Sequence, residues 1–303
     1  MEPRIVLSYL AVYIIWGSTY FFIKIAVETI PPFFGVGLRF FVAGVILLLV
    51  AVATGQMKAR PTLREILYTC LLSALLLIGG NGLVMVAEQS VDSYLAALLI
   101  SSTPLMVTVF DRVLLGKKAG WVQIAGIIIG IAGIALLFYH PGTWSFRFSA
   151  GDILLLCAVA SWALGTSLGH KFPVHENSLV NSGVQMLFAG IACLAFIAVM
   201  PGRAVDVAAG FSARSLLALG YLIFIGSLGF IAYTYLIKHE PAVRVTSYAL
   251  VNPVIAVALG LLLGHEKPVA FLLPGCVLAL IGLALMLYGN TIVARLRRGK
   301  TLS

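Results

Sequence analysis

Charged residues are scarce in this sequence, and their scarcity excludes a soluble protein. Asp, Glu, Lys and Arg together make up 10% of the 303 residues, whereas 61% are apolar. A soluble domain carries about a quarter charged residues. Apolar stretches of about 18 residues or more recur from one end of the chain to the other, as they do in proteins built from membrane-spanning helices. The sequence therefore predicts an integral membrane protein that lies in a lipid bilayer.

Cysteine and acidic side chains are also few, and their positions exclude several kinds of site. The four cysteines, Cys70, Cys157, Cys193 and Cys276, all lie in apolar stretches, where cysteine packs as a small apolar residue. We therefore expect no disulfide, no metal site and no cofactor. None of the eleven acidic residues lies near the middle of a stretch, where proton relays keep a carboxylate. Proton coupling, if present, would use Glu88 or a histidine; otherwise the solute would move down its gradient.

The apolar stretches predict an all-α fold of ten transmembrane helices joined by short connections. The expected ranges are 5–28, 34–53, 66–87, 92–115, 119–139, 151–172, 177–200, 213–238, 242–264 and 268–291. These ranges leave no room for a domain outside the membrane.

The basic residues predict the orientation of these helices. Lys and Arg collect on the cytoplasmic side of membrane proteins. With a cytoplasmic N-terminus, fourteen of the twenty basic residues fall inside: Arg4, Lys58, Arg60, Arg64, Arg112, Lys117, Lys118, Lys171, Lys238, Arg244, Arg295, Arg297, Arg298 and Lys300. Both termini are therefore expected in the cytoplasm. The net charge of +9 follows from this topology, so nucleic acid is not expected as a partner.

The second half of the chain repeats the first. Residues 91–139 align without a gap on 240–288, and "RFFVAG" (Arg39–Gly44) aligns on "QMLFAG" (Gln185–Gly190) at an offset of 146 residues. The order of matching blocks is kept, which indicates a five-helix unit present twice. We place the first repeat at 1–139, a connecting loop at 140–150, the second repeat at 151–291 and a basic cytoplasmic tail at 292–303. Because five is odd, the second repeat should cross the membrane upside down.

Inversion predicts a central cavity between the repeats at half the depth of the membrane. Trp16 aligns on Trp162, and Pro104 aligns on Pro253; all four lie near the middle of their helices. Proline breaks a helical hydrogen bond, and irregular backbone at this depth is tolerated where it lines a cavity. Prolines also occur as plain kinks in spanning helices. We expect helix kinks at Pro104 and Pro253.

Polar and aromatic residues near this depth are candidate ligands for a solute. The candidates for substrate binding are Trp16, Tyr20, Asn81, Trp162, Tyr248 and Asn252. An aromatic lining suits either flat apolar side chains or cations over ring faces. The same amides could instead hydrogen-bond between helices. Four charged residues near the outer ends of their helices, Lys24, Glu28, Arg39 and Glu88, are candidates for a gate, and Lys24 and Glu28 are spaced to pair.

Four short motifs resemble those of a known family. They are "YIIWGSTYF" (Tyr13–Phe21), "GNG" with "VAE" (Gly80–Gly82, Val86–Glu88), "SWALG" (Ser161–Gly165) and "TSYALVNPVIAVALG" (Thr246–Gly260). With them the chain resembles the EamA-type exporters of the drug/metabolite transporter superfamily, in particular the YedA/PecM-like subgroup. The resemblance implies ten spans, an inverted repeat, and a cavity lined by the first, third, fourth, sixth, eighth and ninth helices. It also implies export of amino acids or related small metabolites across the inner (plasma) membrane.

The expected function is therefore export of a small-molecule substrate, an amino acid or an amphipathic cation, by alternating access. The alternative is a membrane-embedded enzyme that acts on a small or lipid-linked substrate. The motifs "HENSL" at His175 and "HEKPV" at His265 both lack the second histidine of a zinc-protease helix, and no GxSxG motif occurs. We therefore expect no catalytic residues. The sequence leaves the oligomeric state open.

Overall fold

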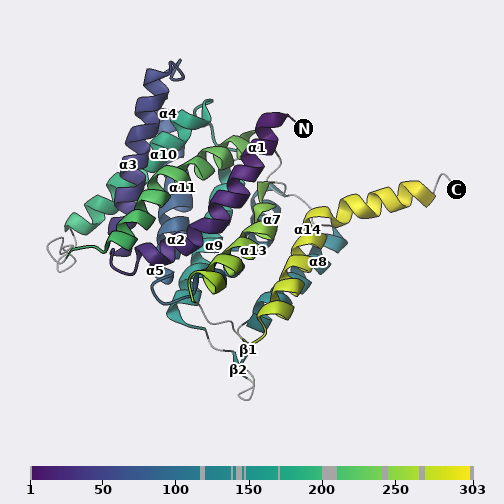
Figure 1. Cartoon of the computed structure of the whole chain (residues 1–303). Coiled ribbons are helices and arrows are strands. Elements are labelled where there is room, and N and C mark those ends of the chain that lie inside the picture. The colour runs from purple at the N-terminus through teal and green to yellow at the C-terminus, as the bar shows by residue number, and fades with distance from the viewer. Residues whose placement is uncertain are drawn as a thin grey trace.

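The chain folds into a bundle of helices, as a computed structural model shows (Figure 1). The structure describes residues 2–116, 120–137, 139–140, 145–146, 148–169, 171–199, 210–240, 245–265 and 270–300. Within these residues, each range expected from the sequence corresponds to one helix or to a series of consecutive helical segments, which we call a rod. In chain order they are α1, η1 and α2 (Pro3–Ala11, Val12–Trp16, Gly17–Ala26), α3 (Pro32–Ala53), α4, η2 and α5 (Leu63–Ser73, Ala74–Gly82, Leu83–Ala87), α6 and α7 (Ser93–Ile100, Thr103–Leu115), α8 (Trp121–Leu137), α9 (Ala150–Gly169), α10 (Ser178–Val199), α11 (Ala213–His239), α13 (Tyr248–Leu262) and α14 (Leu272–Lys300).

Local sequence explains where several rods begin and end. Thr62 caps α4: its hydroxyl accepts from the Glu65 N–H, and the Glu65 carboxylate accepts from the Thr62 N–H. Pro32 begins α3, where a missing N–H costs nothing. Gly116 ends α7 in the left-handed conformation, with φ of 66°. The two π-helical segments, η1 and η2, widen the first and third rods near their middle.

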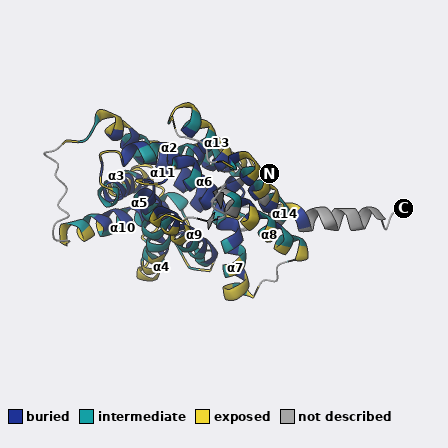
Figure 2. Ribbon diagram, turned by 90° about the horizontal axis from the view of Figure 1, so that it is seen from below, coloured by how far each residue is buried: buried dark blue, intermediate teal, exposed yellow. Residues whose placement is uncertain are grey.

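Within the part of the chain that the structure describes, seven rods are long and apolar enough to cross a membrane. They are Pro3–Ala26, Pro32–Ala53, Leu63–Ala87, Ser93–Leu115, Ala150–Gly169, Ser178–Val199 and Ala213–His239. Shorter apolar helices cover Trp121–Gly133, Val251–Leu262 and Leu272–Gly282. Large apolar side chains also face outward, such as Val113, 73% exposed, and Leu217, 76% exposed. Figure 2 shows the buried residues at the centre of the bundle and the exposed ones at its rim. A rim of this kind requires a lipid environment.

Helices α3 and α10 pack closely against each other in opposite directions. A Cβ atom placed on Gly44 would lie 2.7 Å from Cα of Leu187, and one placed on Gly190 would lie 2.5 Å from Cα of Phe41. The later residue of one helix thus meets the earlier residue of the other, which makes the pair antiparallel. Backbones approach this closely only because both positions are glycine.

Helices α8 and α14 form a second antiparallel pair, which lies to one side of the bundle (Figure 1). A Cβ atom on Gly133 would lie 2.9 Å from Cα of Ala279, and one on Gly282 would lie 2.6 Å from Cα of Gly130. Small residues therefore bring this pair of backbones together as well.

The connections gather on two opposite sides of the bundle. On the side where α1 begins, here the N-terminal side, His175 Nε2 lies 3.1 Å from Ala59 O, and Lys238 Nζ donates to Glu176 O. On the opposite side, Ser212 N donates to Thr29 Oγ1 at 3.1 Å. The described connections around residues 59 and 175 therefore lie on one side, and those around residues 29 and 212 lie on the other.

Three details differ from the sequence-based expectation. The helix expected to reach residue 139 ends at Leu137, and Tyr139–His140 (β1) pairs antiparallel with Ser145–Phe146 (β2) inside the expected loop. Aromatic residues such as those at 139 and 146 favour strands. The tail expected from residue 292 continues α14 as helix to Lys300, because it contains good helix formers and no proline.

The backbone around Pro104 differs from that around Pro253. The fourth rod is interrupted by a turn at Ser101 and Ser102, and Pro104 lies in the first turn of α7. Pro253 lies inside α13, which remains helical through it. A turn at Thr246 and Ser247 immediately precedes α13.

Candidate functional site

Four aromatic side chains from four rods meet at the centre of the bundle; we call them the aromatic cluster. They are Trp16, Trp162, Tyr233 and Tyr248. The ring centroid of Trp16 lies 5.3 Å from that of Trp162, 4.8 Å from that of Tyr233 and 5.2 Å from that of Tyr248. The Tyr233 hydroxyl lies 2.7 Å from the hydroxyl of Thr166. These distances are those of mutually attractive aromatic pairs.

Glycines of other rods make room for the two tryptophans. A Cβ atom placed on Gly229 would lie 2.7 Å from Nε1 of Trp16, and one placed on Gly80 would lie 2.6 Å from Cε3 of Trp162. Trp16 ends the π-helical segment η1, and Gly80 lies in the π-helical segment η2. Such segments are frequent at functional sites because they redirect side chains.

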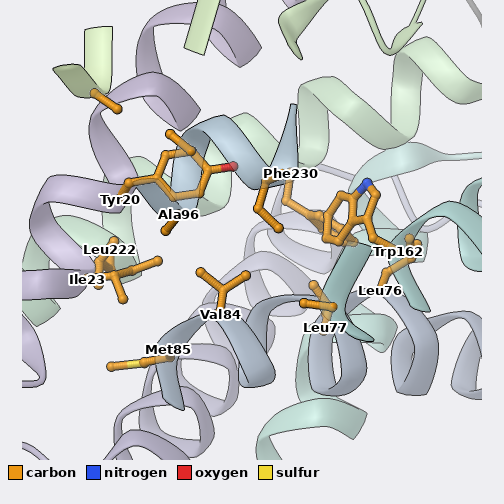
Figure 3. Close-up of a cluster of buried hydrophobic side chains, with 14 of the residues drawn as sticks. Tyr20, Ile23, Leu76, Leu77, Val84, Met85, Ala96, Trp162, Leu222 and Phe230 are labelled. Carbon is orange, nitrogen blue, oxygen red and sulfur yellow. The ribbon is translucent and has the colours of Figure 1, made fainter. Parts of the chain in front are cut away.

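A small space, the central cavity, lies against the aromatic cluster. Its volume is about 40 Å³, which is room for about three water molecules. It is lined by Trp16, Thr19, Tyr20, Ile23, Arg39, Gly80, Asn81, Val84, Ile100, Ala158, Trp162 and Tyr248. Figure 3 shows Tyr20 and Trp162 approaching this region from different rods, with Phe230 drawn between them and Val84 below. The cavity in this conformation is too small for a metabolite.

The structure brings together five of the six residues that the sequence nominated for substrate binding. Trp16, Tyr20, Asn81, Trp162 and Tyr248 all line the central cavity. Their rods are far apart in the sequence, so the fold and not local spacing joins them.

Asn252 lies outside the residues that line the cavity. With its amide nitrogen turned toward the neighbouring carbonyls, it donates to the backbone oxygens of Tyr248 and Tyr13, each at 3.2 Å. It is 2% exposed. The side chain therefore ties α13 to the π-helical segment η1.

The four residues nominated for a gate separate into two places. Lys24 Nζ donates to the backbone oxygens of Glu88, at 2.9 Å, and Val91, at 2.8 Å. Glu28 faces Arg214, 3.8 Å away, on an exposed surface. Lys24 and Glu28 thus point to different partners, contrary to the pairing expected from their spacing. Arg39 lines the central cavity instead of this surface.

A second cavity of about 250 Å³ lies nearer the N-terminal side, lined by residues that include Leu76, Gln185, Thr234 and Lys238. Thr234 follows Tyr233 of the aromatic cluster along α11. The second cavity therefore lies next to the aromatic cluster.

Sequence reasoning missed Tyr233 and Thr19. A signal for Tyr233 was present, because Gly226, Gly229 and Tyr233 follow one another at helical spacing and share a face of α11. Among the described residues, no group of three or more His, Cys, Asp and Glu could hold a metal ion.

The sequence is similar to a known protein family and to several of its members. The EamA-like transporter family matches residues 3–139 and again residues 149–288. The uncharacterized inner membrane transporter YedA of Escherichia coli K12 is 40% identical over 258 residues, which cover 84% of this chain and 81% of YedA. Protein PagO of Salmonella typhimurium LT2 is 28% identical over 267 residues, covering 85% and 84% of the two chains.

A solved structure shares the fold. A crystal structure with 18% sequence identity matches with a TM-score of 0.68 and covers 97% of this chain and 99% of that chain. The family match spans most of the sequence in two parts. The chain therefore belongs to the EamA-like transporter family.

Proposed function

We propose that this protein exports small metabolites, amino acids or related compounds, across the inner membrane by alternating access. Ten spanning helices would form two inverted five-helix repeats, 1–139 and 151–291, which the segment 140–150 connects. The single observation that carries the proposal is the contact of Trp16 with Trp162, 5.3 Å between ring centroids. These residues occupy the same position in the two halves of the sequence, so the halves meet at the aromatic cluster.

Exchange of contacts between the halves supports the inverted repeat. At an offset of 146 residues, Gly44 corresponds to Gly190 and Phe41 corresponds to Leu187. The contact of Gly44 with Leu187 thus becomes, when the halves are exchanged, the contact of Gly190 with Phe41, and both are present. Since the two corresponding helices are antiparallel, the operation that exchanges them also reverses their direction.

The contacts between α8 and α14 are likewise preserved when the two halves are exchanged. At an offset of 149 residues, Gly133 corresponds to Gly282 and Gly130 corresponds to Ala279. The contact of Gly133 with Ala279 becomes that of Gly282 with Gly130 on exchange, and both are present. Two independent antiparallel pairs therefore support one two-fold relationship, which in a membrane protein places the axis in the plane of the bilayer.

The packing of the other rods follows this exchange too. The first rod contacts α11 and α13, the eighth and ninth rods, through η1 and α2. The sixth rod, α9, contacts the third rod through η2 and α5, and the fourth rod through α6 and α7. If each rod is replaced by the rod five positions earlier or later in chain order, one set of contacts becomes the other.

The aromatic cluster would act as a barrier in the described conformation. The central cavity lies on one side of it, and the second cavity lies nearer the N-terminal side. A solute could pass only if the cluster opened, which rocking of one repeat against the other would accomplish around the break at Ser101 and Ser102 and the helix that contains Pro253. The basic residues favour the cytoplasm for the N-terminal side.

Counterflow into proteoliposomes tests this function directly. Vesicles containing the full-length protein and loaded with a panel of amino acids, amines and organic acids should take up one labelled member of the panel. Trp16→Ala and Trp162→Ala should abolish uptake and leave the elution profile and helical content unchanged. Trp121→Ala is the matched control, because Trp121 lies on α8 with 81% of its surface exposed. Uptake by both cluster variants at the wild-type rate would refute the proposed site.

A further inference from the structure

Arg39 is a buried cation at the centre of a membrane protein. It lies on α3, is 4% exposed, and lines the central cavity. Burying a charge in an apolar interior is costly unless the charge is paired. Ionisable residues at such depth in membrane proteins mark the path of a substrate or ion.

The partners of Arg39 leave its charge unpaired. Within the described residues no carboxylate lies within ion-pair distance of it, and its Nε atom is sealed from solvent without a hydrogen-bond acceptor. The guanidinium lies 4.8 Å from the ring centroid of Phe40, which is a favourable cation–π contact. A ring face does not replace the oxygen acceptors that the five N–H groups of arginine require.

The backbone opposite Arg39 is arranged so that the guanidinium fits. A Cβ atom placed on Gly226 of α11 would lie 3.0 Å from Nη2 of Arg39. Thr19 and Tyr20, from the first rod, line the same cavity, and Asn81 lines it from η2. The site thus has one cation, several hydroxyl and amide groups, and aromatic walls.

The other residues that line the cavity argue against a cationic solute. None of the described residues that line it is acidic. A cationic solute would therefore meet a buried positive charge with no carboxylate among the lining residues; Glu88, whose buried carboxylate acts electrostatically on Tyr20, lies outside the lining. This argues against the amphipathic cation that the aromatic lining alone would allow.

We infer that the solutes moved by this protein carry a carboxylate, which Arg39 binds in the central cavity while their apolar part packs on the aromatic cluster. The inference rests on the proposed function. Arginine holds a carboxylate by two parallel hydrogen bonds, a geometry that neutral donors do not reproduce. The cavity of about 40 Å³ must widen to admit such a solute, as alternating access requires.

The internal repeat indicates which substitution of Arg39 to test. Arg39 corresponds to Gln185 in the second half, which is 1% exposed and lines the second cavity. Arg39→Gln therefore places at this position the residue that the chain itself uses at the corresponding one. It removes the charge and keeps a polar side chain of intermediate length, so the fold should tolerate it.

Two further variants separate charge from geometry. Arg39→Lys keeps the charge and loses the paired hydrogen bonds. Gly226→Ala keeps Arg39 and shifts its guanidinium by a few tenths of an ångström, because a Cβ atom there would lie 3.0 Å from Nη2. Arg214→Gln is the control, because it removes a cation from an exposed surface where Arg214 is 60% exposed and faces Glu28.

Ligand-induced thermal stabilisation of the full-length protein in detergent tests the inference without requiring transport. The probes are L-phenylalanine, L-leucine and 3-phenylpropionate, each compared with its carboxamide. An acid should raise the melting temperature at a concentration about tenfold or more below that needed for its amide. Arg39→Gln should lose this preference, Gly226→Ala should weaken it, Arg39→Lys should retain part of it, and Arg214→Gln should retain it fully.

The outcomes distinguish this inference from the proposed function. If no acid stabilises the protein, if amides match acids, or if Arg39→Gln keeps the preference, the carboxylate site is wrong. Counterflow of a solute without a carboxylate would then leave the transport proposal standing. Stabilisation by acids through Arg39 without counterflow of any of them would support the site and contradict transport.

Discussion

Trp16 and Trp162 lie edge to face, with ring centroids 5.3 Å apart and an interplanar angle of 82°. They come from corresponding positions of the two halves of the chain. This geometry is favourable because the positive edge of one ring meets the negative face of the other. The contact therefore joins corresponding positions of the two halves, and under the proposed function it is the barrier that a solute would have to open.

The two tryptophans should be energetically coupled. Trp16→Leu, Trp162→Leu and the double variant form a cycle, in which the coupling should be about 0.5–1.5 kcal/mol of unfolding free energy. Reversible unfolding in mixed micelles measures it. Trp121→Leu combined with Trp16→Leu serves as the control and should be additive within about 0.5 kcal/mol. Additive effects of the two cluster variants would contradict a direct contact.

Close packing of α3 on α10 should be sensitive to any added side chain. Gly44→Val would push a β-branched side chain into the backbone at Leu187 and should cost about 1–3 kcal/mol of unfolding free energy. Gly220→Ala is the control, since nothing lies within 4 Å of a Cβ atom there. A lower melting temperature for the first variant and an unchanged one for the second are expected. Equal melting temperatures would show that the two helices separate more readily than their contact implies.

The sequence predicted the positions of the helices because membranes impose a simple rule. A rod of about 20 apolar residues is needed to cross a bilayer, so the positions of the helices can be read from hydropathy. The spacing of Trp16 and Tyr20 was likewise informative, because residues four apart share a helical face. Both residues line the central cavity.

The remaining features depend on contacts between rods, which local spacing does not reveal. The partner of Asn252 is the backbone of Tyr13, on a segment whose π-helical form no pattern indicated. Arg39 was assigned to a gate from its place near a helix end, yet the fold directs it into the central cavity. Lys24 was expected to pair with Glu28 but instead bonds to the end of another rod.

Lys24 should stabilise the side opposite the N-terminus. Its ammonium group donates to the backbone oxygens of Glu88, which caps the C-terminal end of α5, and Val91. A cation at the negative end of a helix dipole is favourable. Lys24→Met should cost about 1–3 kcal/mol and speed amide exchange after α5. The exposed cation Arg214, changed to Met, should cost about 1 kcal/mol or less. Similar costs for both would contradict a special role for Lys24.

The orientation of the bundle can be tested by labelling from one side. Thr29 and Thr54 are both exposed and lie in connections on opposite sides, the first beside Ser212 and the second after α3 on the N-terminal side. In a variant lacking all four cysteines, Thr29→Cys should react with a membrane-impermeant maleimide added to intact cells. Thr54→Cys should react only after the cells are permeabilised. Because fourteen of the twenty basic residues fall on the side of Thr54 in the expected topology, the reverse labelling pattern would mean that charge does not orient this protein.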